Sequence, residues 1–236
     1  MSEEPNYAKT ILCLANSRRP GGRCVAGKEL SGSNIGAWIR PINAQNGNAI
    51  SELDLQLENG AAADVLDVLT IPMAEPRPQG HQTENHVIAP DYYWTKESRA
   101  DWEQVIAATD MGTGMRWPTG QSSYHGLNDK VSEAFAAGLD HSLVLIEPTS
   151  LTLIVGPESQ YGGGSRRRIR AQFMFRRNHY NLVVTDPWIE AKYFARLNGH
   201  FEIENSRLCI SLTEVFNGSA FKLVATVITP DRIGKM

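Results

Sequence analysis

The order of predicted elements in the C-terminal part of the chain is the feature that most constrains the fold. Apolar segments bounded by Gly, Pro, Asn and Asp indicate short strands, and they lie at residues 143–155 (bent at Pro148), 166–175, 180–185, 208–212 and 221–228. Between the third and the fourth, Asp186 precedes Pro187 and Gly199 follows the next apolar segment, which is how a helix begins and ends. The predicted order is three strands, a helix and two strands.

The first ninety residues repeat this order with a shorter helix. Strands are predicted at residues 10–15, 23–30, 37–42, 65–72 and 84–89, and the helix at 50–58. Five strands with a helix between the third and the fourth are the layout of an OB-fold, a Greek-key barrel that binds oligonucleotides on one face. The sequence therefore predicts a mainly β protein with two OB-like β-barrels. A single β-sandwich with helical insertions is the alternative.

The segment between the two predicted barrels has a different pattern. Apolar residues recur at helical spacing over residues 98–109 and 128–139, on either side of a loop rich in Gly, Met, Trp and Pro. We therefore expect a helical connector. The predicted domains are a first barrel at 1–90, the connector at 91–140 and a second barrel at 141–236.

Composition limits the function classes. The formal net charge is −3, so any site for a polyanion must be a local patch. No apolar run is long enough to cross a bilayer, and the polar first residues do not predict a signal peptide. The three cysteines show no metal-binding spacing, and Cys13 and Cys24 are expected to face each other across the first hairpin as buried thiols. We expect a soluble, cytoplasmic protein.

Basic residues cluster around the first predicted turn. Gly21 and Gly22 leave backbone N–H groups open to an anion. Polar and cationic side chains converge on this turn and on the neighbouring strand ends, namely Asn16, Ser17, Arg18, Arg23, Lys28 and Arg40. The pattern predicts a phosphate-binding or nucleic-acid-binding site. The alternative is a hairpin turn that is basic without a ligand.

The predicted strand at residues 166–175 carries a second basic cluster. Alternation places Arg166, Arg168, Arg170 and Arg176 on one face, with Ile169 and the other apolar residues on the core side. No acidic residue occurs between Glu158 and Asp186, so these arginines are expected to lack local partners and to suit phosphates. The residues expected to offer stacking surfaces are Tyr161, Met174, His179 and Tyr180. The alternative is a solvated face, or arginines paired with Glu202 and Glu204.

Signals for catalysis are weak. His81 and His86 are not at the spacing of a helical zinc site. Ser17 and Lys28 could form a nucleophile and base, but no third group completes such a site. The chain has no Gly-x-x-x-x-Gly-Lys and no Gly-x-Gly-x-x-Gly motif. The sequence therefore predicts no catalytic residue, no metal and no cofactor.

Several of these segments resemble a known family. The resemblance is carried by five segments: Ile-Leu-Cys-Leu-Ala-Asn-Ser-Arg-Arg-Pro-Gly-Gly-Arg-Cys-Val-Ala-Gly-Lys at 11–28, Trp-Ile-Arg-Pro at 38–41, Val-Thr-Asp-Pro at 184–187, Cys-Ile-Ser-Leu-Thr-Glu-Val-Phe-Asn-Gly at 209–218 and residues 221–225. These segments resemble a bacterial family described as a dual OB-containing domain. The resemblance implies two OB-like barrels and a nucleic-acid-binding or nucleotide-sensing role in phage-defence (antiviral) or similar conflict systems. It supplies no catalytic residue.

The functional expectation is a non-catalytic module that binds nucleic acid, with single strands favoured, or senses a nucleotide. An effector protein such as a nuclease, helicase or ATPase is the expected partner, and no membrane is involved. Two alternatives remain open from the sequence: an enzyme acting on a nucleotide or nucleic-acid phosphodiester, and a protein-interaction adaptor.

Overall fold

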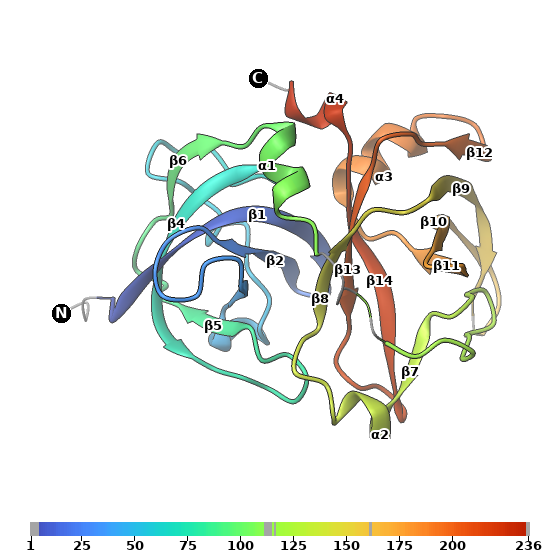
Figure 1. Cartoon of the computed structure of the whole chain (residues 1–236), viewed down its shortest axis with the longest axis horizontal. Coiled ribbons are helices and arrows are strands. Elements are labelled where there is room, and N and C mark those ends of the chain that lie inside the picture. The colour runs from blue at the N-terminus through green and yellow to red at the C-terminus, as the bar shows by residue number, and fades with distance from the viewer. Residues whose placement is uncertain (1–4, 111–114, 116, 161, 235–236) are drawn as a thin grey trace. The chain divides into compact units, whose positions relative to one another are not determined.

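The structure is a computed structural model that describes residues 5–110, 115, 117–160 and 162–234 (Figure 1). Strands hold 49% of the residues and helices 11%, which confirms the prediction of a mainly β protein. The chain divides into two compact units. The first comprises Met1–Ala108 and Asp140–Ser142, and the second comprises Thr109–Leu139 and Leu143–Met236.

The first unit is built on a closed five-stranded barrel. The barrel strands are β1 (Tyr7–Arg19), β2 (Gly22–Glu29), β3 (Trp38–Ile42), β4 (Asp67–Pro76) and β5 (Asn85–Ile88), and a sixth strand, β6 (Thr95–Arg99), pairs with β4. They follow the order β1-β2-β3-β5-β4-β6, and a further pairing of β1 with β4 closes the barrel. The β3–β5 pair is parallel and the others are antiparallel. This is the Greek-key arrangement expected of an OB-like barrel.

The long β1 strand serves two neighbours. Its first half pairs with β4, its second half pairs with β2, and the register shifts between Cys13 and Ala15. Cys13 pairs with Gly27, whereas Cys24 pairs with Ser17. The two cysteines therefore do not face each other across the hairpin as predicted, because the register places them at different levels.

The segment between β3 and β4 contains a 3₁₀ turn (Ala44–Asn46) and no α-helix, so the helix predicted at 50–58 is wrong. Ser51 N donates to the Asp54 carboxylate (2.7 Å), and Asp54 N donates to the Ser51 hydroxyl (3.1 Å). Such side-chain bonds to nearby backbone compete with a helix. Ile50 and Leu55 of this segment are nevertheless buried in the barrel core.

The second unit repeats the barrel order. Its elements are β7 (Lys130–Ser132), α2 (Glu133–Ala136), β8 (Leu143–Ile146), β9 (Ser150–Ser159), β10 (Ser165–Phe175), β11 (Asn178–Val183), α3 (Pro187–Phe194), β12 (Gly199–Glu202), β13 (Arg207–Leu212), β14 (Ser219–Ile228) and α4 (Pro230–Ile233). They form two four-stranded sheets, ordered β11-β10-β9-β12 and β7-β14-β13-β8. A parallel bridge between Val184 and Val224 links the end of β11 to β14. β8 and β9 lie on either side of Pro148 and together correspond to β1 of the first barrel. With this correspondence, the strand order of the second unit matches that of the first barrel.

The core of this unit is the one expected from strand alternation. Ile169, Phe173, Leu182 and Val184 are buried together, and Phe175 is partly buried against them. Helix α3 begins where predicted, because the Asp186 carboxylate accepts a hydrogen bond from Trp188 N (3.0 Å) and Pro187 is the first helical residue. The extra strand β12 was not predicted.

The described residues of the range 91–140 divide between the two units, and their helices are short. β6 and α1 (Trp102–Ala107) belong to the first unit, and β7 and α2 belong to the second. An Asp101–Gln104 capping box begins α1, and β6 pairs with β4, so the predicted helix at 98–109 is shortened. Val131 pairs with Ala220 of β14, which converts the start of the other predicted helix into a strand. Tertiary strand pairing overrides helical spacing in both segments.

The part of the chain that the structure describes contains no helix that is both long and apolar enough to span a membrane.

Candidate nucleic-acid interface

An OB-fold presents two kinds of element to an oligonucleotide: the face of its second and third strands, and the loops that join strands 1 to 2 and 4 to 5. In the first barrel, the strand 1–2 connection is the Arg19–Gly22 turn between β1 and β2. In the second barrel, β10 and β11 are the second and third strands and form this face. The turn of the first predicted cluster and the strand of the second therefore lie where an OB-fold places its ligand-binding elements.

Three loops meet at the β1–β2 end of the first barrel. Asn46 Nδ2 donates to Gly21 O (3.1 Å), and Arg19 Nη2 donates to Gly47 O (3.1 Å). Asn48 Nδ2 donates to Gln79 Oε1 in the β4–β5 loop (3.2 Å). The turn at residues 43–48 thus forms hydrogen bonds with both the β1–β2 turn and the β4–β5 loop, the two connections that an OB-fold uses for ligands.

The side chains predicted to converge on this turn do not all reach the surface. Arg18 is exposed, and Arg23 lies at the surface with its Nε 2.9 Å from Glu52 Oε1. Asn16 Nδ2 donates to the main-chain oxygen of Ala63 (3.2 Å). These contacts leave Arg18 and Arg23 as the surface cations of the predicted set.

The other three predicted residues are buried. Ser17 is buried with its hydroxyl 3.5 Å from Cys24 O, and Lys28 is buried with its Nζ 5.5 Å from the centre of the Trp38 ring. Because Ser17 pairs with Cys24 and Lys28 pairs with Leu12, the strand register separates the two residues considered as a nucleophile and base.

Arg40 is an interior residue rather than a surface cation. It is 1% exposed, its Nη2 lies 3.1 Å from Glu84 Oε1, and the same nitrogen donates to the Ser142 hydroxyl (2.7 Å). The Ser142 hydroxyl also donates to Glu84. The expectation of a single open site including Arg40 is therefore wrong, because the segment Asp140–Ser142 of the same unit supplies a partner for it.

Gly22 has a packing role in the turn. A Cβ atom on Gly22 would lie 2.3 Å from Ile50 O, and Arg23 and Ile50 exchange two backbone hydrogen bonds (2.8 and 2.9 Å). The close approach of these two backbones explains the glycine without an anion.

The second barrel concentrates the positive charge of the molecule. Along β10, Ile169, Ala171 and Phe173 are buried while Arg168 and Gln172 face outward, so the predicted alternation is confirmed. Residues 150–183, which span β9, β10 and β11, contain six arginines and one acidic residue, although the whole chain has a net charge of −3. We call the outer surface of these three strands the arginine face.

The single acid of the arginine face is Glu158, at the end of β9. Its carboxylate lies 2.6 Å from Arg170 Nε and 3.4 Å from Arg168 Nε. The arginines therefore do have a local partner, contrary to the prediction, and it is neither Glu202 nor Glu204. Burial raises the pKa of Glu158, but the hydrogen bond and charge of Arg170 and the charge of Arg168 outweigh it and lower that pKa. Glu158 thus stays anionic and orders two guanidinium groups.

Further arginines flank this ordered pair. Arg166 is exposed at the start of β10, and Arg176 and Arg177 are exposed in the two-residue turn between β10 and β11. The φ angles of Arg176 and Arg177 are 49° and 64°, a conformation that usually selects Asn or Gly. Arg167 points away from this face and donates to Phe194 O (2.7 Å) at the end of α3.

The residues predicted to offer stacking surfaces differ in their exposure. Tyr180 is buried and stacks on Phe173, with ring centres 5.0 Å apart, so it cannot meet a ligand. Tyr161 lies outside the described residues. His179 is exposed and Met174 is half-buried. Tyr124 and His125 were missed, although an aromatic pair within a polar Ser/Gly loop was a visible signal.

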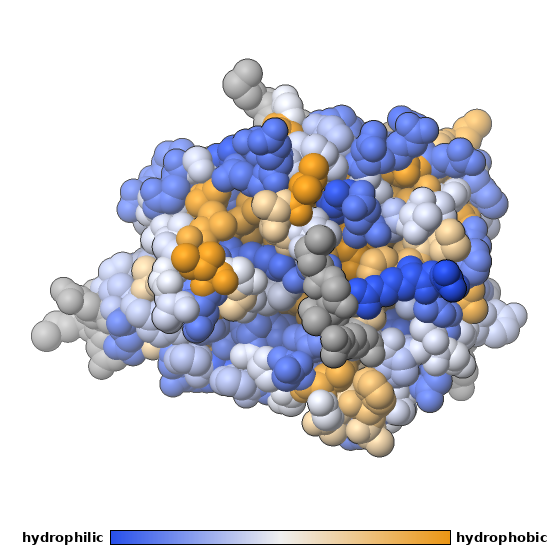
Figure 2. Space-filling model, viewed as in Figure 1, coloured by the Kyte–Doolittle hydropathy of each residue, from blue (hydrophilic) through white to orange (hydrophobic). Residues whose placement is uncertain are grey.

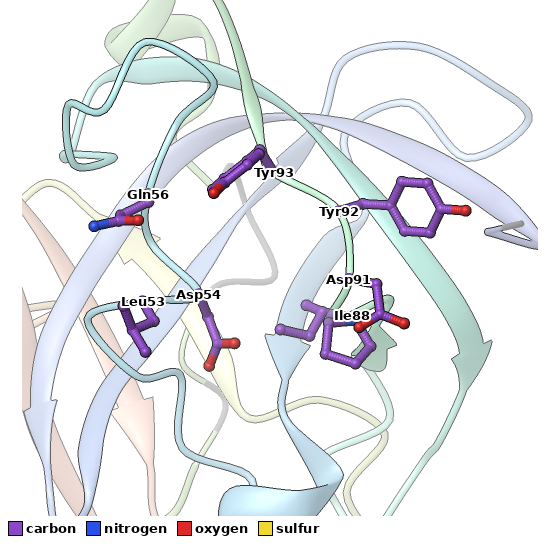
Figure 3. Close-up of a pocket in the computed structure, with 8 residues that line it drawn as sticks. Leu53, Asp54, Gln56, Ile88, Asp91, Tyr92 and Tyr93 are labelled. Carbon is purple, nitrogen blue, oxygen red and sulfur yellow. The ribbon is translucent and has the colours of Figure 1, made fainter. Parts of the chain in front are cut away.

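The first unit also contains a pocket of about 240 Å³. Figure 3 shows that the Asp54 carboxylate and the Ile88 side chain line its opposite walls, while the Tyr92 ring points away. Asp91 adds a second carboxylate, and none of the lining residues is a cation. Phosphate would be repelled there, so this pocket is not part of a nucleic-acid interface.

Hydrophilic residues form most of the surface visible in Figure 2, and hydrophobic residues lie in several separate groups. Among the described residues, no group of three or more His, Cys, Asp and Glu side chains is arranged to hold a metal ion.

Comparison with family models identifies the relationship that the two barrels suggest. The model of the dual OB-containing domain matches residues 9–227. The chain belongs to the dual OB-containing domain family. Comparison of this dual-OB chain with curated proteins found no match, and comparison with solved structures found none either.

Proposed function

We propose that this dual-OB protein binds nucleic acid, with single strands favoured, across the arginine face of its second barrel. The observation that carries the proposal is the charge distribution: residues 150–183 contain six arginines and one acid in a chain that is acidic overall. These arginines lie on β10 or in the turn that joins it to β11, the strands that an OB-fold offers to oligonucleotides, and of the six Arg167 points away from the arginine face. A local patch of this kind attracts a phosphate backbone without making the whole protein basic.

The geometry supports a division of roles among the arginines. Glu158 holds Arg170 and Arg168 in defined positions, which reduces the side-chain entropy lost on binding. Alternate residues of a strand lie about 7 Å apart, so Arg166 and Arg168 can contact successive phosphates of an extended strand. Guanidinium groups bind phosphate oxygens through paired hydrogen bonds. Arg176 and Arg177 extend the positive surface at the far end of β10.

The proposed module serves as the sensor or recognition part of a defence system and works with an effector such as a nuclease, helicase or ATPase. The resemblance to the dual-OB family supports this wider role.

The test is the salt dependence of binding to a fluorescein-labelled single-stranded oligonucleotide, followed by fluorescence anisotropy. Arg166→Gln should flatten the slope of log affinity against log salt by about 0.7, and Arg166→Gln/Arg168→Gln by about 1.4. Lys192→Gln is the control, because Lys192 lies on α3 and pairs with Asp231 (2.6 Å), so its slope should equal that of the parent.

Two results would overturn the proposal. One is an absence of binding by the parent protein at low salt, which would favour the adaptor alternative. The other is a parental slope in the double variant. Shortening of the oligonucleotide during incubation with Mg²⁺ would instead favour the phosphodiesterase alternative.

A further inference from the structure

Tyr124 is an exposed aromatic residue on the loop before β7. Its exposed fraction is 93%, so its ring contributes almost nothing to the core. Single exposed apolar residues are common and need no explanation by themselves. The position of Tyr124 is informative because its loop is firmly attached and because it lies beside the arginine face.

Contacts with β9 and β11 fix the loop on one side. His125 Nε2 lies 3.0 Å from Ser159 Oγ and 3.1 Å from Ser159 O, at the end of β9. Asn181 Nδ2 donates to His125 O (2.9 Å), and Asn181 and Leu127 exchange two backbone hydrogen bonds (3.1 and 3.2 Å). Residues 125–127 therefore reach from β11 to β9 as a strap.

Contacts with β14 fix the loop from beneath. Lys222 is 1% exposed, and its Nζ donates to Pro118 O (2.6 Å) and Asn128 O (2.8 Å). The Asp129 carboxylate accepts hydrogen bonds from the backbone N–H (2.7 Å) and the hydroxyl of Ser123. Hydrogen bonds thus fix both neighbours of Tyr124 in the chain, Ser123 and His125, so the backbone that carries the exposed ring is ordered.

The same contacts place Tyr124 next to the arginines. Its ring meets the His125 ring edge to face, with centres 4.7 Å apart and planes at 82°. His125 bonds to Ser159, the neighbour of Glu158, and its charge contributes to the low pKa of Glu158. Glu158 in turn pairs with Arg168 and Arg170. The Tyr124 ring is thus linked through His125 and Ser159 to the end of β9 that holds Glu158 and its two arginines.

We propose that Tyr124 stacks on a base of the bound nucleic acid, and that the ligand is consequently single-stranded. The inference rests on the proposed function and specifies its ligand. Aromatic side chains stack on bases of any identity when the base face is free. In a duplex that face is occupied by neighbouring base pairs, so the ring has no partner there. Sequence preference at this position is therefore weak.

The experiment compares parent, Tyr124→Ala and Tyr124→Phe with a labelled single-stranded oligonucleotide and with the duplex of the same sequence. Tyr124→Ala should weaken single-strand binding by about 5- to 150-fold, whereas Tyr124→Phe should retain parental affinity because its ring is kept. The salt slope should not change in either variant. Tyr93→Ala is the matched control: Tyr93 is 59% exposed in the first unit and should have no effect.

The outcomes separate this inference from the proposed function. If Tyr124→Ala binds like the parent while Arg166→Gln/Arg168→Gln flattens the slope, the stacking role is wrong and the arginine face stands. If Tyr124→Ala weakens single strand and duplex equally, or lowers the melting temperature, the loop only supports the fold and the inference is again overturned. Absence of binding by the parent refutes both.

Discussion

Arg40 offers the sharpest test of how the first barrel is built. The side chain is 1% exposed and its charge is balanced by Glu84, whose carboxylate is 3.1 Å away. Replacing Arg40 by Met keeps most of the side-chain volume but leaves the Glu84 carboxylate buried without a counter-charge. Breaking a buried pair in this way costs about 3–5 kcal/mol of unfolding free energy. That is about a fifth or more of the unfolding free energy of an ordinary domain.

The assay is urea unfolding followed by pulsed hydrogen exchange and mass spectrometry, which reports on peptides of the first unit separately. With a slope of about 2 kcal/mol per molar urea, the midpoint should fall by about 2 M. Arg23→Met is the matched control, because its partner Glu52 is 69% exposed. An exposed pair contributes about 1 kcal/mol or less, so the control should stay close to the parent.

A double variant completes the test. Arg40→Met/Glu84→Leu removes both charges, and replacement of a buried pair by apolar residues is often nearly neutral. It should therefore be more stable than either single variant. If Arg40→Met costs no more than Arg23→Met, Arg40 is not buried with Glu84, and it returns to the set of surface cations.

Two further predictions concern pH and backbone packing. Burial lowers the pKa of Lys222 to about 8 from its usual 10.5, so the unfolded state binds more protons between these pH values and stability should rise with pH. From pH 7 to pH 10 the parent should gain about 2 kcal/mol or slightly more relative to Lys222→Met in urea unfolding, and a pH-independent difference would contradict this. Gly22→Ala should lose more than about 1 kcal/mol in thermal unfolding, because its Cβ would meet Ile50 O, whereas Gly156→Ala has open space and should be near neutral; equal losses would refute the packing role.

The proposed interface could be predicted in part. The alternation of arginines with Ile169, Ala171 and Phe173 marks β10 as a strand with one charged face, and the structure confirms it. The ion pair of Arg168 and Arg170 with Glu158 could not be anticipated, because it depends on how β9 and β10 are aligned. The position of Tyr124 was overlooked for a related reason: its loop is attached to the second barrel through contacts with β9 and β11, which join residues far apart in the chain.

The sequence by itself determined the two sets of strands, the start of α3 at Asp186 and Pro187, and the prediction that each set of strands forms an OB-like barrel. These features depend on residues close together in the chain, where side-chain period, turn residues and caps act locally. Tertiary structure alone decided that residues 91–140 divide between the units, since β6 and β7 exist only through pairing with β4 and β14. It also decided that Arg40 is buried, because Glu84 and Ser142 approach it from distant segments, and the free energy of a charge depends on what surrounds it.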